Sequence, residues 1–552
     1  MRITNKIMQN NNLSNINTNK IYQDKLSTQM STQKKINRPS DDPVVAIRAL
    51  RLRSNVTEVT QYYSKNIPDA TSWLNVTEDA LNNLTQVLTN MIGQCEKGSN
   101  GPLKTEDREI ILKQLKALAD EVYSTADADY AGRYVFGGYR TDTSISFTEA
   151  QDLLYEIVEQ LDPSAIDSVT KVNTDKLLDI NASNYMDVNV TEQDVDSVDC
   201  YRIRLAYDKC VGDGSAAPSI SFLKQKTQPK MKEDGTPELD GEGNQVYEPV
   251  IGADGKPEYE RITWVAKDGN GAGDITTMHS YEDPYTEAAN DPDAIIYVPE
   301  TGELLLGANR YNELMSLKDD ASTVANESEI RVTYQKSEWE KGDLRPQHYF
   351  ACTAMPEGEK PIEYNQSYLT DGAERQYIEY DVGFNQTIRV NSRADECFDP
   401  GIGREVDDLI NAIQNVLDLE SAKSKIQDIM KTMEGDEEAI AHLQNQLDAV
   451  DKALTLAKDK EQKLFESGIT AFQGYLDDAN LCVTECGTRS SKLALIEMRM
   501  QNQKTTFETL KSNNEDADFT EVAILLNSAE LTYNGALLAA GKVMSASLLN
   551  FI

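Results

Sequence analysis

Cysteine and histidine are the side chains of this 552-residue chain that could bind a metal ion or act as nucleophiles; it has seven cysteines and three histidines. Cys482 and Cys486 lie four residues apart, so on a helix both thiols would share one face and could bind a metal. We favour a simpler interpretation, small residues in a helix packing seam. His279, His348 and His442 are far apart in sequence. The sequence therefore predicts no catalytic, cofactor-binding or metal-binding residue, and the odd cysteine count argues against a disulfide scaffold.

Two acidic segments resemble calcium-binding loops without completing one. The segment that begins Asp268-Gly269-Asn270-Gly271 has Ala272 and His279 where an EF-hand loop has oxygen ligands. Residues 240–251 lack the central glycine and the final carboxylate of such a loop. We interpret both segments as acidic turns.

The composition argues against two classes of partner. The net charge is −38 at pH 7, whereas a nucleic-acid-binding protein is expected to present a basic surface. No apolar run reaches the ~18 residues that a membrane-spanning helix requires. The first twelve residues lack the continuous apolar segment of a Sec-type signal peptide. We therefore expect neither nucleic acid nor membrane as a partner, and a protein that is cytoplasmic or exported by a route that reads another signal.

The elements that must position any functional residue begin with two amphipathic helices, residues 1–36 and 519–552. Neither helix can bury its apolar stripe alone, so each needs the other or a neighbouring subunit. The predicted assembly interface comprises Ile3, Ile7, Leu13, Ile16, Val522, Leu525, Ala529, Ala536, Ala539, Val543 and Ala546. This pattern is typical of a building block of a polymer.

Residues 1–36 differ from the rest of the chain in composition. They contain seven asparagines, which are poor helix formers, so we expect this N-terminal assembly arm to be disordered until it is assembled. They also carry six basic residues against one acidic residue. This charge is either a solvated face or a device that sets register against acidic neighbours.

The segments next to the two arms have the apolar spacing of three and four that is typical of coiled coils. In Pro39-Ser40-Asp41-Asp42-Pro43, Asp42 is the expected N-cap and Pro43 the first helical residue. The spacing slips near Tyr63 and Ile67, where Pro68 predicts a stutter or a kink. A second helix is expected from Thr105, with Thr105 as its N-cap. Residues 37–140 and 400–511 are thus the predicted halves of a helical rod, and 512–552 the C-terminal assembly helix.

The middle of the chain, residues 141–399, differs from both flanks. After a short helix expected near residues 148–161, it is rich in Gly, Pro, Asp and Thr, with short β-like runs such as residues 201–205 and 330–334. We expect one or two inserted outer β-rich domains that fold independently of the rod, with close ends near Tyr139 and Tyr380. The predicted fold class is mainly α with an inserted β-rich region: a discontinuous long-helix coiled-coil rod built from both termini.

Four segments together resemble the hook-associated protein 3 family, the hook–filament junction proteins of the flagellin superfamily. They are Met1-Arg2-Ile3-Thr4, Pro39-Ser40-Asp41-Asp42-Pro43, Gly132-Arg133-Tyr134-Val135-Phe136-Gly137-Gly138-Tyr139 and Ser512-Asn513-Asn514-Glu515-Asp516-Ala517-Asp518. Their order and their distances from the chain ends carry the resemblance, which covers about residues 1–140 and 375–552.

The resemblance implies a structural subunit, not an enzyme, that assembles with its own copies in rings at the hook–filament junction of the bacterial flagellum. It implies hook-associated protein 1 and flagellin as neighbours and export by the flagellar type III apparatus without a cleaved signal peptide. It also implies an export chaperone that binds near residues 519–552. Two alternatives stay open: flagellin itself, and a secreted enzyme or adhesin on a coiled-coil stalk.

Overall fold

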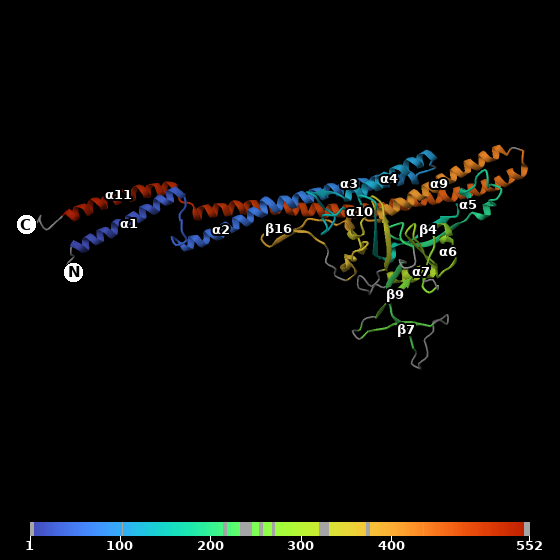
Figure 1. The fold of residues 1–552 in the computed structure, drawn as a ribbon, viewed down its shortest axis with the longest axis horizontal. Helices are drawn as coiled ribbons and strands as arrows, with labels where there is room; N and C mark the ends of the chain where they lie inside the picture. The colour runs from blue at the N-terminus through green and yellow to red at the C-terminus, as the bar shows by residue number, and fades with distance from the viewer. Residues whose placement is uncertain are drawn as a thin grey trace, which may run out of the picture. The chain divides into compact units, whose positions relative to one another are not determined.

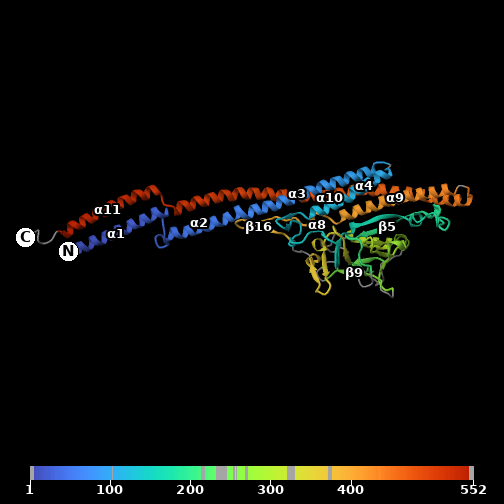
Figure 2. The ribbon, with the colours of Figure 1, turned by 45° about the horizontal axis from the view of Figure 1, so that its top comes forward.

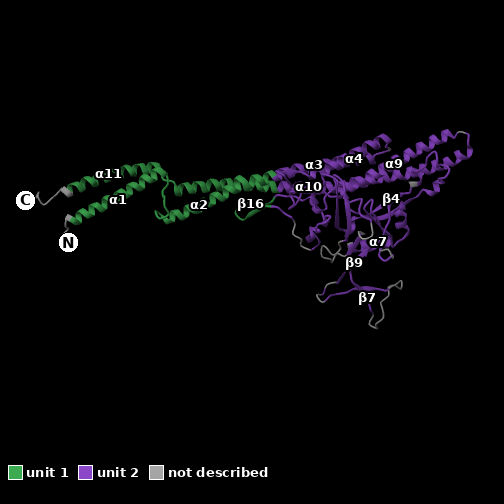
Figure 3. Cartoon of the chain, viewed as in Figure 1, with its two compact units in different colours: residues 1–72, 379–389, 489–552 green, residues 73–378, 390–488 purple. Residues whose placement is uncertain are grey.

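The computed structural model describes residues 5–101, 103–212, 218–231, 245–252, 255, 258–267, 271–319, 330–370, 376–433 and 435–545. The chain divides into two compact units (Figure 3). Unit 1 comprises Met1–Ser72, Glu379–Arg389 and Arg489–Ile552; unit 2 comprises Trp73–Ile378 and Val390–Thr488. The fold class predicted from the sequence is confirmed, since long helices come from both ends of the chain and strands from its middle.

Unit 1 is built almost entirely from helices. Its elements are α1 (Asn5–Thr32), α2 (Pro43–Gln61), a π-helical turn (Tyr62–Asn66), the start of α3 (Ile67–Ser99), the end of α10 (Glu437–Glu515), α11 (Phe519–Ser545) and the hairpin of β16 (Glu379–Gly383) and β17 (Gln386–Arg389). Helices α1 and α11 lie side by side and antiparallel, as both ribbon views show (Figures 1 and 2).

The predicted irregularity beside Pro68 is a π-helical turn. The backbone N–H of Ile67 donates to the carbonyl of Tyr62, five residues earlier. Pro68 has no N–H to donate, and its ring would clash with the carbonyl four residues before it. A π turn inserts one residue into the helix, so it absorbs the slip in the apolar spacing and lets α3 continue along the same path.

The helices of unit 2 are the rest of α3, α4 (Thr105–Ala126), α9 (Gly401–Thr432) and α10 up to Thr488. The prediction of Thr105 as the N-cap of α4 is wrong by one residue. Lys104 is the cap: its N–H donates to the Asp107 carboxylate at 3.4 Å, and its carbonyl accepts from Arg108 at 3.0 Å. The four shorter helices are α5 (Asp175–Leu178), α6 (Pro284–Asn290), α7 (Ala308–Met315) and α8 (Ala394–Cys397).

Unit 2 also contains two larger sheets. The six-stranded sheet is antiparallel throughout, in the order β15 (Ile362–Tyr364), β14 (Ala351–Met355), β3 (Gln151–Leu161), β13 (Ile330–Trp339), β6 (Ser219–Gln225) and β9 (Tyr259–Val265). The five-stranded sheet has the order β10 (Ile275–Thr277), β11 (Ile295–Val298), β12 (Glu303–Leu306), β5 (Ser197–Arg204) and β4 (Ile166–Val172), and only β10 and β11 are parallel. Two short hairpins pair β1 (Asp129–Tyr130) with β2 (Arg133–Tyr134) and β7 (Thr227–Pro229) with β8 (Tyr247–Pro249).

The prediction of a short helix near residues 148–161 is wrong, because this segment is strand β3. Leu154, Ile157 and Leu161 have helical spacing, but Tyr155, Ile157 and Glu159 are buried in the alternation of a strand. Strands β13 and β14 both pair with β3. The sequence pattern was compatible with both structures, and pairing on two sides decided between them.

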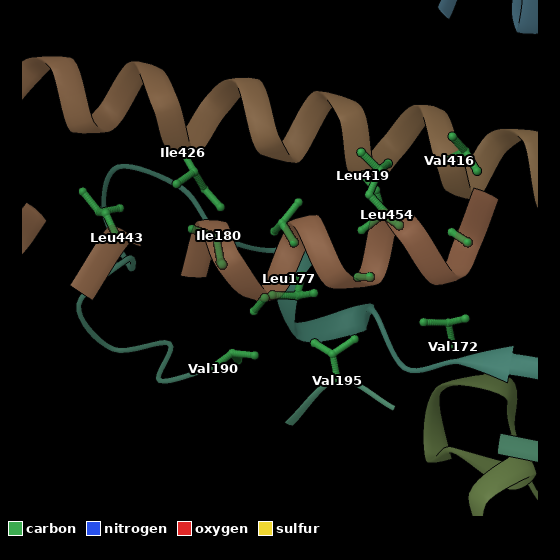
Figure 4. Close-up of a cluster of buried hydrophobic side chains, with 14 of the residues drawn as sticks. Val172, Leu177, Ile180, Val190, Val195, Val416, Leu419, Ile426, Leu443 and Leu454 are labelled. Atoms are coloured by element: carbon green, nitrogen blue, oxygen red, sulfur yellow. The ribbon is translucent and has the colours of Figure 1, made fainter. Parts of the chain in front are cut away.

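The middle of the chain packs directly on the helices of unit 2. Figure 4 shows a core in which Val172, Leu177, Ile180, Val190 and Val195 meet apolar side chains of α9 and α10. The helical side of this core comprises Val416, Leu419, Ile426, Ile429, Leu443, Ala449, Val450, Ala453, Leu454 and Ala457. This shared core argues against the prediction that the middle folds independently of the rod, which stays a prediction until it is tested by deletion.

A buried ionic network extends the same contact. Arg202 on β5 donates to Asp167 at 2.7 Å, to Glu303 at 2.6 Å and to Asp408 on α9 at 2.8 Å. Arg204 also binds Asp408, at 2.7 Å. The two guanidinium groups hold the pKa of Asp408 below its usual value in spite of burial, which acts in the opposite direction. Strand β5 is thus held to α9 by charged groups that would be costly to leave unpaired.

Candidate assembly surface

Helices α1 and α11 bury only a narrow seam against each other. Leu26, Val522 and Ala529 form its buried cluster, with Met30, Ala517 and Leu526 packed around them. On α11 the buried and half-buried positions are 522, 523, 526, 529, 533, 536 and 540, and all except 523 repeat the coiled-coil spacing of three and four. The pairing therefore satisfies one stripe of each helix and no more.

The predicted interface residues are distributed over this pair of helices. Val522 and Ala529 are buried, and Ile16 and Ala536 are half-buried. The exposed ones are Ile7, Leu13, Leu525 and Ala539. Ile3 and Ala546 lie outside the described residues, and Val543 lies in α11 with its side chain outside the description. Val522 and Ala529 contact the other arm, and a role in assembly stays a prediction for all eleven residues.

The sequence analysis missed a second apolar stripe on α11. Ile524, Leu531 and Leu538 follow each other at intervals of seven residues, and 64, 79 and 73% of their surfaces are exposed. A Cβ atom at Gly535 or Gly541 would meet no other atom within 4 Å, so the backbone is open to close approach there. The seven-residue repeat of large apolar residues was a readable signal, and exposed stripes of this kind mark interaction sites.

In unit 1, hydrogen bonds and ion pairs connect the segments that lead from the α1–α11 pair to α2 and the end of α10. The N–H of Lys35 donates to the carbonyl of Glu515 at 2.7 Å, and that of Ala517 to the carbonyl of Gln33 at 2.9 Å. The Glu515 carboxylate is buried and accepts two bonds from Arg53, at 2.6 and 2.7 Å. The Arg53 guanidinium holds the pKa of Glu515 below its usual value. The segment that follows α1 and the segment between α10 and α11 are thus bonded to each other at one place.

The segment from Pro39 to Pro43 closes the loop before α2. The Asp42 carboxylate accepts from the N–H groups of Val44 and Val45, at 3.0 and 3.1 Å, and Pro43 is the first helical residue. The role of Asp41 was not predicted. Its carboxylate accepts from the N–H groups of Arg38 and Asn37, at 3.0 and 3.2 Å, and these bonds lower its pKa. The two adjacent carboxylates therefore have different roles: Asp41 stabilises the loop, and Asp42 caps the start of α2. Pro39 and Ser40 are exposed.

The cysteines lie in the interior of the protein. All seven are free of disulfide bonds and buried; Cys486 lies 3.5 Å from the carbonyl of Leu74, and Cys482 lies 3.2 Å from that of Glu396. Within the described ranges, no three His, Cys, Asp or Glu side chains are grouped to hold a metal. Of the helices in those ranges, none combines the length and the apolar character needed to cross a membrane.

Comparison with known proteins finds similarity in the N-terminal quarter of the chain. The model of the bacterial flagellin N-terminal helical region matches residues 3–141. Flagellar hook-associated protein 3 of Salmonella typhimurium and that of Escherichia coli are each 31% identical over 145 residues, which is 26% of this chain and 45% of each relative. A flagellin of Clostridium tyrobutyricum is 30% identical over 122 residues, 22% of this chain and 32% of that protein. The matches thus span less than half the length of these relatives.

Two solved structures align over most of the chain with low similarity. A flagellar hook-associated protein of Vibrio parahaemolyticus is 13% identical with a TM-score of 0.30, over 86% of this chain and all of that one. The flagellar junction protein of Legionella pneumophila is 10% identical with a TM-score of 0.23, over 82% of this chain and 99% of that one. Residues 3–141 of this chain are therefore similar to the N-terminal helical region of bacterial flagellins, as found also in flagellar hook-associated protein 3.

Proposed function

We propose that this chain is a structural, non-catalytic subunit of the bacterial flagellum whose copies form the junction between hook and filament. The observation that carries the proposal is the exposed stripe of Ile524, Leu531 and Leu538 on α11. A helix that buries one stripe on α1 and leaves a second apolar stripe in water is suited to packing against helices of neighbouring subunits. The similarity to hook-associated protein 3 favours the junction as the place of assembly.

The neighbours follow from the same proposal. Hook-associated protein 1 would lie on one side of the ring of copies and flagellin on the other. The protein would leave the cell through the flagellar type III apparatus, and an export chaperone would bind near residues 519–552 and cover the exposed stripe of α11 before assembly. Covering this stripe would prevent premature association, because exposed apolar surface drives polymerisation wherever copies meet.

Flagellin is the second candidate, favoured by the match to the Clostridium tyrobutyricum protein. A filament subunit would use the same helices but would be present along the whole filament. A secreted enzyme or adhesin on a stalk has no comparable support, because the relatives reported above are named as flagellins and flagellar hook-associated proteins.

Immunogold labelling of isolated flagella distinguishes these functions. We expect a single band of label between hook and filament. Label along the filament would favour flagellin, and flagella without any label would contradict both proposals. Quantification of copies per flagellum is the supporting measurement, since a junction needs few copies and a filament many.

A further inference from the structure

Charge is distributed very unevenly between the two units. The segments of unit 1 hold 18 Lys and Arg residues and 14 Asp and Glu residues, a net charge of +4. Unit 2 therefore carries −42 of a chain whose total is −38. Two copies would repel through their second units, whereas the first unit of one copy and the second unit of another attract.

The positive charge of unit 1 includes a defined face of α2. Val44, Ile47 and Leu50 are exposed by 67, 56 and 65%, a large fraction for apolar side chains on a helix whose opposite face is packed. Arg48 and Arg51 are exposed as well, and they lie four and seven residues after Val44, so they share its side of the helix. Neither guanidinium has an ion-pair partner among the residues that the structure describes. An apolar stripe bordered by two unpaired cations is a surface prepared for an acidic apolar partner.

Unit 2 presents a surface of that chemistry on α10. Leu481 is 60% exposed, and Asp477, Asp478 and Glu485 are exposed on the same helical face. The comparable exposed residue on α4, Ile110, has a lysine among its neighbours, Lys113, which pairs with Glu109 at 3.7 Å. The face around Leu481 has acidic residues on both sides of the apolar side chain, and the first basic residue that follows on α10 is Arg489, four residues after Glu485.

We propose that the α2 face of one copy, Val44, Ile47, Arg48, Leu50 and Arg51, docks on the α10 face around Leu481 of a second copy. This inference rests on the proposed function, in which copies of the chain assemble. Apolar side chains would form the centre of the contact, and Arg48 and Arg51 would face the carboxylates of Asp478 and Glu485. Burial of the apolar centre supplies the affinity, and the paired charges fix the register and exclude contact between two acidic units.

Photo-cross-linking in assembled flagella tests the contact. The full chain, with Leu50 replaced by p-benzoylphenylalanine, is expressed in cells and irradiated in isolated flagella. We expect a product of twice the 61.5 kDa chain mass, with the cross-link mapped by mass spectrometry to residues 473–488. Cross-links to a different protein or to another segment would overturn the inference, as would flagella that contain the chain but give no product.

Charge reversal provides the matched controls. Arg48→Glu with Arg51→Glu should abolish the cross-link and motility, and adding Asp478→Lys with Glu485→Lys to the same chain should restore both. Adding Glu106→Lys with Glu109→Lys on α4 instead should restore neither. An unchanged cross-link in the arginine variant would refute the contact, as would equal rescue by the α4 pair. Absence from flagella of the chain that carries only the cross-linker at Leu50 and of the parent chain would contradict the proposed function and this inference with it. Presence of that chain with a cross-link to another segment would contradict only the inference.

Discussion

Unit 1 and unit 2 are stabilised in different ways. The cluster between α1 and α11 has three buried residues, and the outer stripe of α11 is exposed. In unit 2, one cluster alone has fifteen buried residues, and charged side chains such as Arg202, Glu303 and Lys336 are buried with partners. Unit 2 therefore buries its apolar core within itself, whereas unit 1 leaves an apolar stripe of α11 in water. The difference shows which part of the chain has apolar surface available for the proposed assembly.

The largest expected effect comes from replacing residues 165–365 by a short Gly/Ser linker. The sequence alone suggested that this change would leave the helices intact. The structure predicts the opposite for α9 and the neighbouring part of α10, because Val172, Leu177, Ile180, Val190 and Val195 would leave their core. Circular dichroism should show a loss of helix larger than the deleted short helices account for. An unchanged helical signal would show that α9 and α10 do not depend on the middle of the chain, and the proposed difference between the two units would be wrong.

Deletion of residues 519–552 should abolish assembly and leave unit 2 folded. The deletion removes the exposed stripe of α11 and the partner of α1. All three tryptophans, Trp73, Trp264 and Trp339, lie in unit 2, so their fluorescence during denaturation reports unit 2 alone. We expect an unchanged unfolding midpoint and cells without motility. Normal flagella on such cells would contradict the assembly role, and reduced secretion would instead support chaperone binding at this segment.

Leu177→Ala should lower the free energy of unfolding of unit 2 by about 2–5 kcal/mol, because it leaves a cavity in the core shared by the middle and the helices. Ile110→Ala is the matched control, since Ile110 is exposed on α4 and should change stability by less than ~0.5 kcal/mol. Tryptophan fluorescence in urea measures both variants. Equal effects would mean that the α5 segment does not contribute to the core.

Glu159 gives unit 2 a pH dependence between about pH 4.5 and 7. Burial raises the pKa of this carboxyl to about 7, although Tyr334 and the N–H of Ala206 donate hydrogen bonds to it. Between the unfolded value near 4.5 and about 7, the folded protein binds more protons than the unfolded one, so stability falls as pH rises through this window.

Glu159→Gln should remove this dependence. Between pH 5 and pH 8 the parent chain should lose about 3 kcal/mol of unfolding free energy through this carboxyl, and the variant should not show this loss. Urea denaturation followed by tryptophan fluorescence at both pH values measures it. Parallel pH profiles of the two proteins would show that Glu159 is ionised in the folded state.

The smallest effect is expected from Asp42→Ala in unit 1. Loss of the bonds to the N–H groups of Val44 and Val45 should destabilise the start of α2 by about 1 kcal/mol. Hydrogen exchange of residues 43–47 is a suitable local measurement, with Ser40→Ala, on the exposed part of the same loop, as control. Faster exchange in the control than in the Asp42 variant would show that Asp42 is not the cap of α2.

Local signals in the sequence were sufficient for the long helices, the irregularity beside Pro68 and the position of Asp42 at the start of α2. These features depend on neighbours within one or two helical turns, where apolar spacing, proline and a capping carboxylate act directly on the backbone. The sequence also carried the family resemblance at its N-terminal end. The seven-residue repeat of Ile524, Leu531 and Leu538 was present as well, but only exposure distinguishes it from the buried stripe beside it.

Only the tertiary structure decided which segments meet. The pattern of residues 151–161 fits a helix or a strand, and pairing with β13 and β14 made it a strand. The contact of Leu177 with α9 and α10 joins residues more than two hundred positions apart, and the ion pairs of Arg202 with Asp408 do the same. Such contacts depend on shape and on the sharing of buried charge across the fold, and neither quantity is encoded in the spacing of neighbouring residues.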